Sequence, residues 1–288
     1  MALLRVQRII QQAGLGSRRQ AEAWIKAGRV TIDGIKAQLG DLADPDQQKV
    51  AVDSRPVIPR SEPLAYLALY KPRGYTTSMK DRHAEHLITE LIPRKFGRVF
   101  PVGRLDKESE GLIILTNDGV LAHALMHPSR EVKKVYDVWV KGIPKKSHLE
   151  RMRQGIALED GPARPDVVEL ISRREGRALI RVVLHEGKNR EIRRIFDSIG
   201  HGVEELIRIR YANIGLNNLE PGQFRPLTHR EVRELKAVVI RGLDDREPAP
   251  KQTKSAGGPR YSKREKLPAR RSGTEVGRTP GNSGRTHR

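Results

Sequence analysis

Six short segments rich in branched and aromatic residues dominate the chain from residue 64 to about residue 245. Each is bounded by Gly, Pro or charged residues, which is typical of β-strands that end in turns. The segments are LAYLALY, FPVG, LIILT, YDVWVKG, VVELIS and ALIRVVLH. Helical spacing returns in NREIRRIFDSIG and again near Val232 and Leu235. This alternation predicts an α+β fold with a mainly antiparallel mixed sheet.

The first sixty residues have the pattern of a separate helical module. One predicted helix ends at Gly14, and the sequence Ser17-Arg18-Arg19-Gln20 is a capping box that begins a second helix ending at Gly28. RVTIDG then predicts a strand that closes on an Asp-Gly turn. The apolar residues at helical spacing are Val6, Ile9, Ile10, Ala13, Ala21, Trp24 and Ile25.

The chain is strongly basic, with 55 Lys and Arg against 35 Asp and Glu and a formal charge of +20. A polyanion is the natural partner, with nucleic acid first and an anionic membrane surface second. No stretch approaches the roughly 20 apolar residues of a spanning helix, and the N-terminus lacks a long apolar region. We expect a monomer that stays in the cytoplasm and has no membrane partner. The absence of cysteine excludes disulfides, thiolate zinc sites and Cys nucleophiles.

The last 43 residues differ in composition from the rest. Residues 246–288 hold twelve Lys or Arg, three Asp or Glu, six Gly and five Pro, and few apolar residues. Such a segment cannot bury enough apolar surface to offset the entropy of ordering, so we expect a disordered basic tail that either grasps RNA or keeps the protein soluble. The predicted domains are 1–60, 61–245 and the tail, and a Pro-rich linker at 55–63 lies across the first boundary.

Four basic residues lie at the two ends of the second predicted helix: Arg18, Arg19, Lys26 and Arg29. They could face phosphates while the Trp24 side faces the core, or they could simply be solvated charges on an exposed helix. The sequence L-G-S-R-R-Q-A-E followed by G-R-V-T-I-D-G resembles the alpha-L RNA-binding motif first described in the fourth protein of the small ribosomal subunit. This resemblance covers about residues 4–50 and favours RNA binding.

One acidic residue, Asp106, lies in a polar loop directly before a strand that looks buried. A loop edged by rigid strand can hold a catalytic side chain exposed and still. Physical reasoning by itself favours an ordinary turn residue at this position.

The segment G-R-L-D-x-x-S-x-G-L-I-I-L-T-N-D-G, which contains Asp106, resembles the signature loop of pseudouridine synthases. Three further motifs of that family occur in order: Lys-Pro-Arg-Gly at 71–74, Lys-Val-Tyr at 134–136 and EGKNREIRR at 186–194. The closest group is the family of ribosomal small subunit pseudouridine synthase A, which includes large subunit synthases B, E and F. The basic tail and the last motif look most like synthase B, which implies large-subunit rather than small-subunit ribosomal RNA as the substrate.

The resemblance implies roles for particular side chains. Asp106 would be the essential carboxylate, acting either as a nucleophile or as a base while the uracil rejoins the ribose through C5. Tyr136 would stack on a flipped base, with packing in the core as its alternative. Arg193 would pair with Asp106, its alternative being a pair with Asp197 along the helix. The expected pocket residues are Leu184 and Ile192.

Further cations would surround the flipped nucleotide, since a folded RNA substrate needs several phosphate contacts. The candidates are Lys71, Arg73, Arg104, Lys188, Arg190 and Arg194. The isomerisation needs no cofactor. Two His pairs, 83 with 86 and 123 with 127, lack the H-E-x-x-H arrangement, so we expect no metal site.

Two other functions compete with the synthase. One is a non-catalytic ribosomal RNA-binding or assembly factor that keeps the fold. The other is a metal-dependent nuclease that uses Asp106, Glu108 and Asp118. Intact Asp106, Tyr136 and Arg193 favour the enzyme over the first alternative, and an activity requiring a divalent metal would identify the second.

Overall fold

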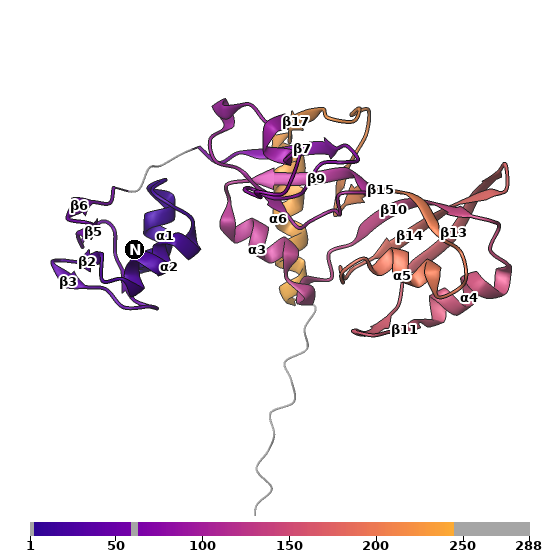
Figure 1. Cartoon of the computed structure of the whole chain (residues 1–288), viewed down its shortest axis with the longest axis horizontal. Coiled ribbons are helices and arrows are strands. Elements are labelled where there is room, and N and C mark those ends of the chain that lie inside the picture. Colours follow the sequence, from indigo (N-terminus) through magenta and orange to yellow (C-terminus); the bar gives the residue numbers. More distant parts are fainter. Residues whose placement is uncertain (1–2, 59–62, 245–288) are drawn as a thin grey trace, which may run out of the picture. The chain divides into compact units, whose positions relative to one another are not determined.

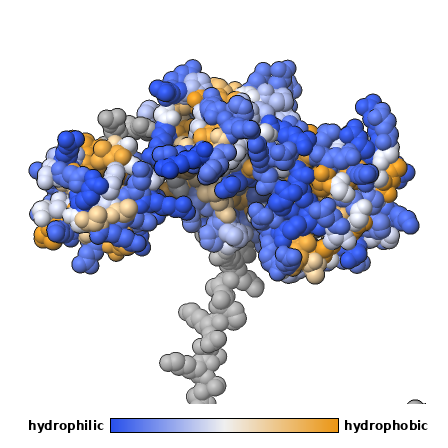
Figure 2. Space-filling view, in the orientation of Figure 1, coloured by the Kyte–Doolittle hydropathy of each residue, from blue (hydrophilic) through white to orange (hydrophobic). Residues whose placement is uncertain are grey.

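A computed structural model describes residues 3–58 and 63–244 of the chain (Figure 1). The predicted disordered tail lies outside the described residues. Within the described part, no helix combines the length and the apolar character needed to cross a membrane. Hydrophilic residues cover most of the face shown in Figure 2, and apolar residues form separate patches on it.

The N-terminal module contains the two predicted helices and the predicted hairpin, together with further short strands that the sequence did not predict. Its helices are α1 (Val6–Gln12) and α2 (Arg18–Lys26). Its strands are β1 (Leu4–Arg5), β2 (Val30–Ile32), β3 (Ile35–Lys36), β4 (Leu42–Ala43), β5 (Val50–Val52) and β6 (Arg55–Pro56). Strands β3-β2-β5-β6 form one antiparallel sheet, and β1 pairs with β4.

The capping box at the start of α2 is confirmed, because Ser17 Oγ accepts from Gln20 N and Gln20 Oε1 accepts from Ser17 N. The Asp33-Gly34 turn is confirmed too, with φ angles of 51° and 87°. One expectation was wrong: the proposed linker starts too early. Arg55–Pro56 pairs with β5, and Val57 is buried in the core of the module, so residues 55–57 belong to the module.

The second folded part is built on a nine-stranded sheet with the order β13-β14-β10-β15-β9-β7-β17, to which β8 and β16 add. Strand β15 runs parallel to β9, and the other pairings between the described strands of this sheet are antiparallel, as predicted. The strands are β7 (Tyr66–Lys71), β8 (Phe100–Val102), β9 (Glu110–Thr116), β10 (Lys134–Lys141), β13 (Val167–Arg174), β14 (Arg177–Leu184), β15 (Val203–Tyr211), β16 (Ile214–Gly215) and β17 (Phe224–Pro226).

Helices and a small hairpin complete this part. The α-helices are α3 (Gly119–Met126), α4 (Lys146–Gln154), α5 (Glu191–Asp197) and α6 (His229–Asp244). Short 3-10 helices are η1 (Ile88–Leu91), η2 (Arg94–Phe96) and η3 (Pro128–Arg130), and β11 (Ile156–Leu158) pairs with β12 (Gly161–Ala163). In Figure 1, α3 and α6 lie beside the β7–β9 half of the sheet, and α4 and α5 lie with the β10–β14 half.

Alternating side chains along β9 bury both faces of the sheet at its centre. Leu112 and Ile114 belong to a core shared with α3 and α6, whereas Ile113 and Leu115 belong to a larger core on the other face. The larger core includes the predicted apolar stripe of α5. Because strand side chains alternate between faces, a strand covered on both sides reads as the continuous apolar run LIIL. The rigid β9 therefore fixes the loop that precedes it.

Candidate active site

Asp106 lies in the loop between β8 and β9, with its side chain 35% exposed. Backbone and side-chain hydrogen bonds hold this loop from several directions. Ser109 N donates to Asp106 O at 3.1 Å, and Gly74 N donates to Lys107 O at 2.8 Å. The buried Thr77 hydroxyl donates to Leu105 O at 2.8 Å. The carboxylate is thus accessible while its backbone is fixed on both sides, as a catalytic group requires.

Lys71 anchors the same loop from within the protein, and the expectation that it contacts phosphate is wrong. Its side chain is fully buried, and Nζ donates to the carbonyls of Pro72, Lys107 and Ser109 at 2.9, 3.3 and 2.6 Å. Burial lowers the pKa of Lys71 to about 8. An ammonium group enclosed by three carbonyls cannot reach RNA, so it serves the geometry of the loop.

Gly111 lets the loop enter β9 where β9 meets β15. Its φ is +108°, and a Cβ at this position would lie 2.4 Å from Arg208 O and 2.6 Å from Arg208 N. No other residue fits without moving β15, because backbone atoms form the obstacle. The glycine of the signature loop therefore sets the close parallel approach of Gly111 to Arg208.

A cavity of about 100 Å³ opens beside Asp106. It brings together residues from the loop, from β10 and from the segment that leads into α5. The predicted site residues that line it are Arg104, Asp106, Tyr136, Leu184, Lys188, Arg190 and Ile192. Tyr136 is 8% exposed and packs in the larger core, so its ring is both a core residue and a wall of the cavity. A larger cavity elsewhere in this part of the chain does not contain Asp106.

The ion pair of Asp106 differs from the predicted one. Arg190 Nη1 lies 3.8 Å from Asp106 Oδ2, whereas the Arg193 guanidinium donates to Val203 O at 3.1 Å and to Glu108 O at 3.3 Å. Burial, followed by the nearby Arg190, lowers the pKa of Arg193, and the Asp106 charge opposes this change. Arg193 thus holds the Asp106 loop through a backbone carbonyl and adds positive potential near the carboxylate.

Two further cations, on strands beside the loop and the cavity, donate to backbone carbonyls. Besides Lys71 and Arg193, Arg208 is 2% exposed and donates through Nε to Leu112 O at 2.7 Å. Lys134 donates through Nζ to Val132 O and His185 O, both at 2.9 Å, and burial lowers its pKa to about 8. Each of these side chains donates to at least one backbone carbonyl, whereas Arg193 Nε and Arg208 Nη2 are buried without a hydrogen-bond partner among the described residues. Their positive charges favour an anionic substrate.

Two carboxyl groups meet on the far side of the cavity. Glu191 is 4% exposed, and burial together with a hydrogen bond to Glu186 raises its pKa to about 7. Glu191 Oε2 accepts from Lys188 N at 3.0 Å, and Glu186 Oε2 lies 3.2 Å from Lys188 Nζ. Glu191 thus holds the segment that presents Arg190 through its hydrogen bond to Lys188 N.

The remaining side chains predicted to contact RNA differ in whether they already bind a partner within the protein. Arg104 is exposed at the cavity rim. Arg73 pairs with Glu108 at 2.9 Å, and Arg194 forms a bidentate pair with Asp160 at 2.8 and 2.9 Å. Lys188 Nζ also donates to Pro162 O. Arg194 and Lys188 thus hold the β11–β12 hairpin against α5, and phosphate would have to compete with these partners.

In the N-terminal module, Arg18, Arg19 and Lys26 lie on α2 with exposed or partly exposed side chains. Arg29 forms two hydrogen bonds with Asp53, at 2.9 and 2.5 Å, and its guanidinium lies 5.5 Å from the Trp24 ring centroid. Its surface is still accessible, but its charge is compensated.

The described residues do not form the metal site that the nuclease hypothesis requires. Among residues 3–58 and 63–244, no group of three or more His, Asp or Glu could hold an ion. Asp118, one of the three acids of the nuclease hypothesis, follows the far end of β9, where it caps α3 and accepts from Tyr66 Oη at 2.8 Å. Glu108 pairs with Arg73. The three acids therefore do not form one site.

Comparisons with known proteins agree with this geometry. Residues 65–198 match the model of the RNA pseudouridylate synthase family, and residues 4–49 match the S4 domain. Ribosomal large subunit pseudouridine synthase B of Bacillus subtilis is 40% identical over 242 residues, which cover 83% of this chain and 98% of the relative. This chain belongs to the RNA pseudouridylate synthase family.

Two more relatives extend the comparison. An uncharacterized RNA pseudouridine synthase of Mycobacterium tuberculosis is 42% identical over 240 residues, covering 82% of this chain and 94% of the relative. The crystal structure of a pseudouridylate synthase has a TM-score of 0.58 and 26% identity, covering 81% of this chain and 99% of that one. The predicted fold and the synthase assignment are confirmed. Naming the family after the small-subunit synthase is a slight mismatch, because similar relatives carry the name of large subunit pseudouridine synthase B.

The sequence did not indicate the role of several residues that support the synthase site. The motifs do not identify Thr77, Arg208 or the Glu186–Glu191 pair as supports, and they include Lys134 without indicating its role. For Arg208 the sequence does carry a signal. It lies two positions after Leu206 in the sequence L-I-R-I-R, so both side chains point to the same face of the strand and both are buried. For Thr77 no signal exists, because its hydroxyl binds the carbonyl of Leu105, 28 residues away, and local sequence patterns do not reveal such contacts.

Proposed function

We propose that this protein isomerises a specific uridine of large-subunit ribosomal RNA to pseudouridine. The observation that carries the proposal is a partly exposed carboxylate on a rigid loop, at the mouth of a cavity walled by Tyr136 and surrounded by cations. The S4 match and the large-subunit name of the relatives support the substrate. The excess positive charge of the chain fits a polyanionic partner.

In the proposed reaction the target uridine leaves its stack and enters the cavity. Asp106 acts on the ribose or the base, either as nucleophile or as base, to release the glycosidic bond. Tyr136 stacks on the uracil, and its hydroxyl helps to remove the C5 proton. Leu184 and Ile192 form the apolar wall against which the free uracil turns.

We assign two roles to the cations: some position Asp106, and others bind RNA phosphates. Arg190 orients the Asp106 carboxylate, and Arg193 and Lys71 fix its loop. Arg104 and Arg73 lie exposed near the carboxylate and would bind phosphates next to the flipped nucleotide, as would Lys188 and Arg194 if the RNA displaced their present partners. The α2 residues Arg18, Arg19 and Lys26, with Arg29 at its end, would bind RNA away from the reaction.

The other proposals concern the chain as a whole. Residues 1–60 form the RNA-binding domain, 61–245 the catalytic domain and 246–288 a basic tail, and the protein works in the cytoplasm as a monomer. The reaction uses no cofactor, since the isomerisation neither oxidises nor consumes an external group.

Mapping pseudouridine in ribosomal RNA from cells that lack this protein tests the proposal. We expect one large-subunit site to lose its modification and to regain it when the wild-type chain is supplied. Asp106→Asn should not restore the site, whereas Asp197→Asn, an exposed change on α5, should restore it. An unchanged modification map in the deficient cells would refute the proposed function.

A further inference from the structure

A cavity with a volume of about 960 Å³ lies in the catalytic domain, and Asp106 is not among the residues that line it. This volume is at the upper end of the roughly 300–1,000 Å³ typical of ligand pockets. Strand β7, the short helix η2, strand β17 and helix α6 contribute its walls. These elements lie together in Figure 1. We call this feature the β7–α6 groove.

Aromatic and aliphatic side chains form much of the groove surface. Tyr66 and Phe96 are partly buried, and Leu227 lies beside them. The Phe96 ring is fixed by an edge contact with Phe224, the two centroids being 5.5 Å apart. Tyr66 is fixed through its hydroxyl, which donates to Asp118 Oδ2 at 2.8 Å. Two rings held in place and open to a cavity are suited to contact flat apolar groups, as in grooves that bind single strands.

Exposed cations from two different elements line the same groove. Arg94 and Lys95 belong to η2, and Arg233 and Lys236 belong to α6. None of the described residues that line the groove is Asp or Glu. Lys236 lies 4.0 Å from Asp118 Oδ2 and 5.3 Å from the Tyr66 ring centroid, so its charge is only weakly compensated. The groove surface therefore favours an anionic occupant.

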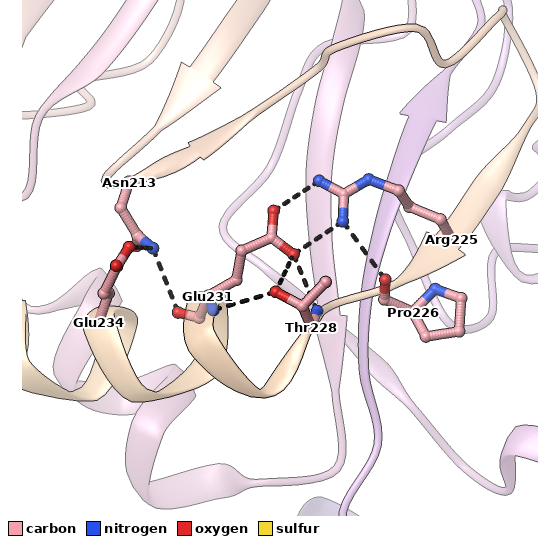
Figure 3. A network of polar contacts seen from close by, with 6 residues as sticks. All are labelled: Asn213, Arg225, Pro226, Thr228, Glu231 and Glu234. Atoms are coloured by element: carbon pink, nitrogen blue, oxygen red, sulfur yellow. Dashed lines mark hydrogen bonds and ion pairs between the residues drawn. The ribbon is translucent and has the colours of Figure 1, made fainter.

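Glu231 and Glu234 of α6 do not line the groove, and each is bound by other polar groups (Figure 3). Glu231 accepts from Arg225 Nη1 and Nη2 at 2.8 and 2.7 Å, and from Thr228 N at 2.8 Å. Glu234 accepts from Arg230 Nε at 2.7 Å and from Asn213 Nδ2 at 3.4 Å. The Arg225 contacts also tie β17 to the first turn of α6, so two walls of the groove are joined rigidly.

We propose that the β7–α6 groove is a second RNA-binding site, which holds a single-stranded segment of the substrate away from the target uridine. This inference rests on the proposed function. Bases would pack on Tyr66 and Phe96, and phosphates would pair with the η2 and α6 cations. Contacts made equally before and during the reaction strengthen substrate binding and leave the chemical step unchanged.

Two kinds of variant test the groove in the full-length protein. Arg94→Glu/Lys95→Glu reverses charge on one wall, and Ala237→Trp fills the groove without changing charge. The matched control is Lys146→Glu/Arg151→Glu, which reverses two exposed cations on α4. KM and kcat are measured on a ribosomal RNA fragment, and affinity is measured separately with fluorescent hexauridylate.

We expect both groove variants to raise KM about fivefold or more, with kcat within about twofold of wild type, and the α4 control to leave both unchanged. The charge variant should also reduce the salt slope of hexauridylate binding by about 1.4, at roughly 0.7 for each lost phosphate contact. RNA containing 4-thiouridine should crosslink to the peptide that holds Tyr66 or Phe96.

Wild-type turnover separates the two proposals. If wild type forms no pseudouridine on any ribosomal RNA, the proposed function fails. If wild type is active and the groove variants keep its KM and its hexauridylate affinity, the groove does not bind RNA. Loss of affinity for hexaglutamate with retained affinity for hexauridylate would assign the groove to an acidic peptide and overturn the inference.

Discussion

Substitution of Glu191 by Gln tests the raised pKa of this buried carboxyl beside the cavity. The pKa of Glu191 rises from 4.5 to about 7, because the group is buried and faces Glu186. The folded state therefore binds this proton more tightly than the unfolded state does. The resulting stability is fully present below pH 4.5 and is lost as the pH rises through 7. The introduced glutamine would keep a hydrogen-bond donor toward Glu186 and would not titrate.

The expected size follows from linkage. One pKa unit corresponds to about 1.4 kcal/mol, so a rise from 4.5 to 7 sets an upper bound of roughly 3 kcal/mol. Because Glu191 interacts with Glu186, part of the effect is spread over both groups, and we expect about 2 kcal/mol. Between pH 5 and pH 8, the unfolding free energy of wild type should fall by this amount relative to Glu191→Gln.

Urea unfolding at several pH values measures the effect. The chain has two Trp, and Trp24→Phe in both proteins leaves Trp139 on β10 as the reporter of the catalytic domain. Glu169→Gln, an exposed change on β13, is the matched control and should run parallel to wild type. Parallel curves for wild type and Glu191→Gln across this range would refute the raised pKa of Glu191.

Three further variants test the supports of the site. Lys71→Met should lower kcat by about tenfold or more without weakening RNA binding, because Lys71 fixes carbonyls of the loop and cannot reach phosphate; a large rise in Kd with normal kcat would contradict this. Gly111→Ala should cost about 3 kcal/mol or more, since its Cβ would overlap Arg208 backbone atoms, and a normal Tm would count against it. Glu231→Gln should cost about 1–2 kcal/mol at pH 7 and little near pH 2, because Arg225 lowers the pKa of Glu231 to about 2 and its contribution is lost as the pH falls through that value; equal losses at both pH values would exclude this cause.

Local patterns in the sequence predicted much of the fold. The capping box at Ser17 and the apolar stripe of α5 depend on residues a few positions apart, and both are confirmed. Strand β15 was missed because charged residues interrupt its apolar pattern, although it lies at the centre of the sheet. Its partners β10 and β9 are distant in sequence, so local spacing does not reveal the order of the strands.

In the candidate site, too, local motifs were informative, whereas contacts between distant residues were not predicted. Asp106, Tyr136 and Arg190 belong to three different motifs, and the structure brings them to one cavity. Residue type did not reveal that Lys71 is buried, because two of the three carbonyls that surround its Nζ come from a loop more than 35 residues away. Likewise, the sequence did not reveal that Arg193 donates to the carbonyls of Glu108 and Val203 and not to Asp106, because these contacts depend on how α5 packs.

The role of Asp106 is tested most directly by release of tritium from ribosomal RNA labelled at C5 of uridine. Because pseudouridine joins the ribose through C5, each turnover releases one label to water. We expect wild type to release label from one site of the large-subunit RNA and Asp106→Asn to release none while binding the RNA with unchanged affinity. Release by Asp106→Asn at the wild-type rate would contradict the assignment of Asp106 as the catalytic carboxylate.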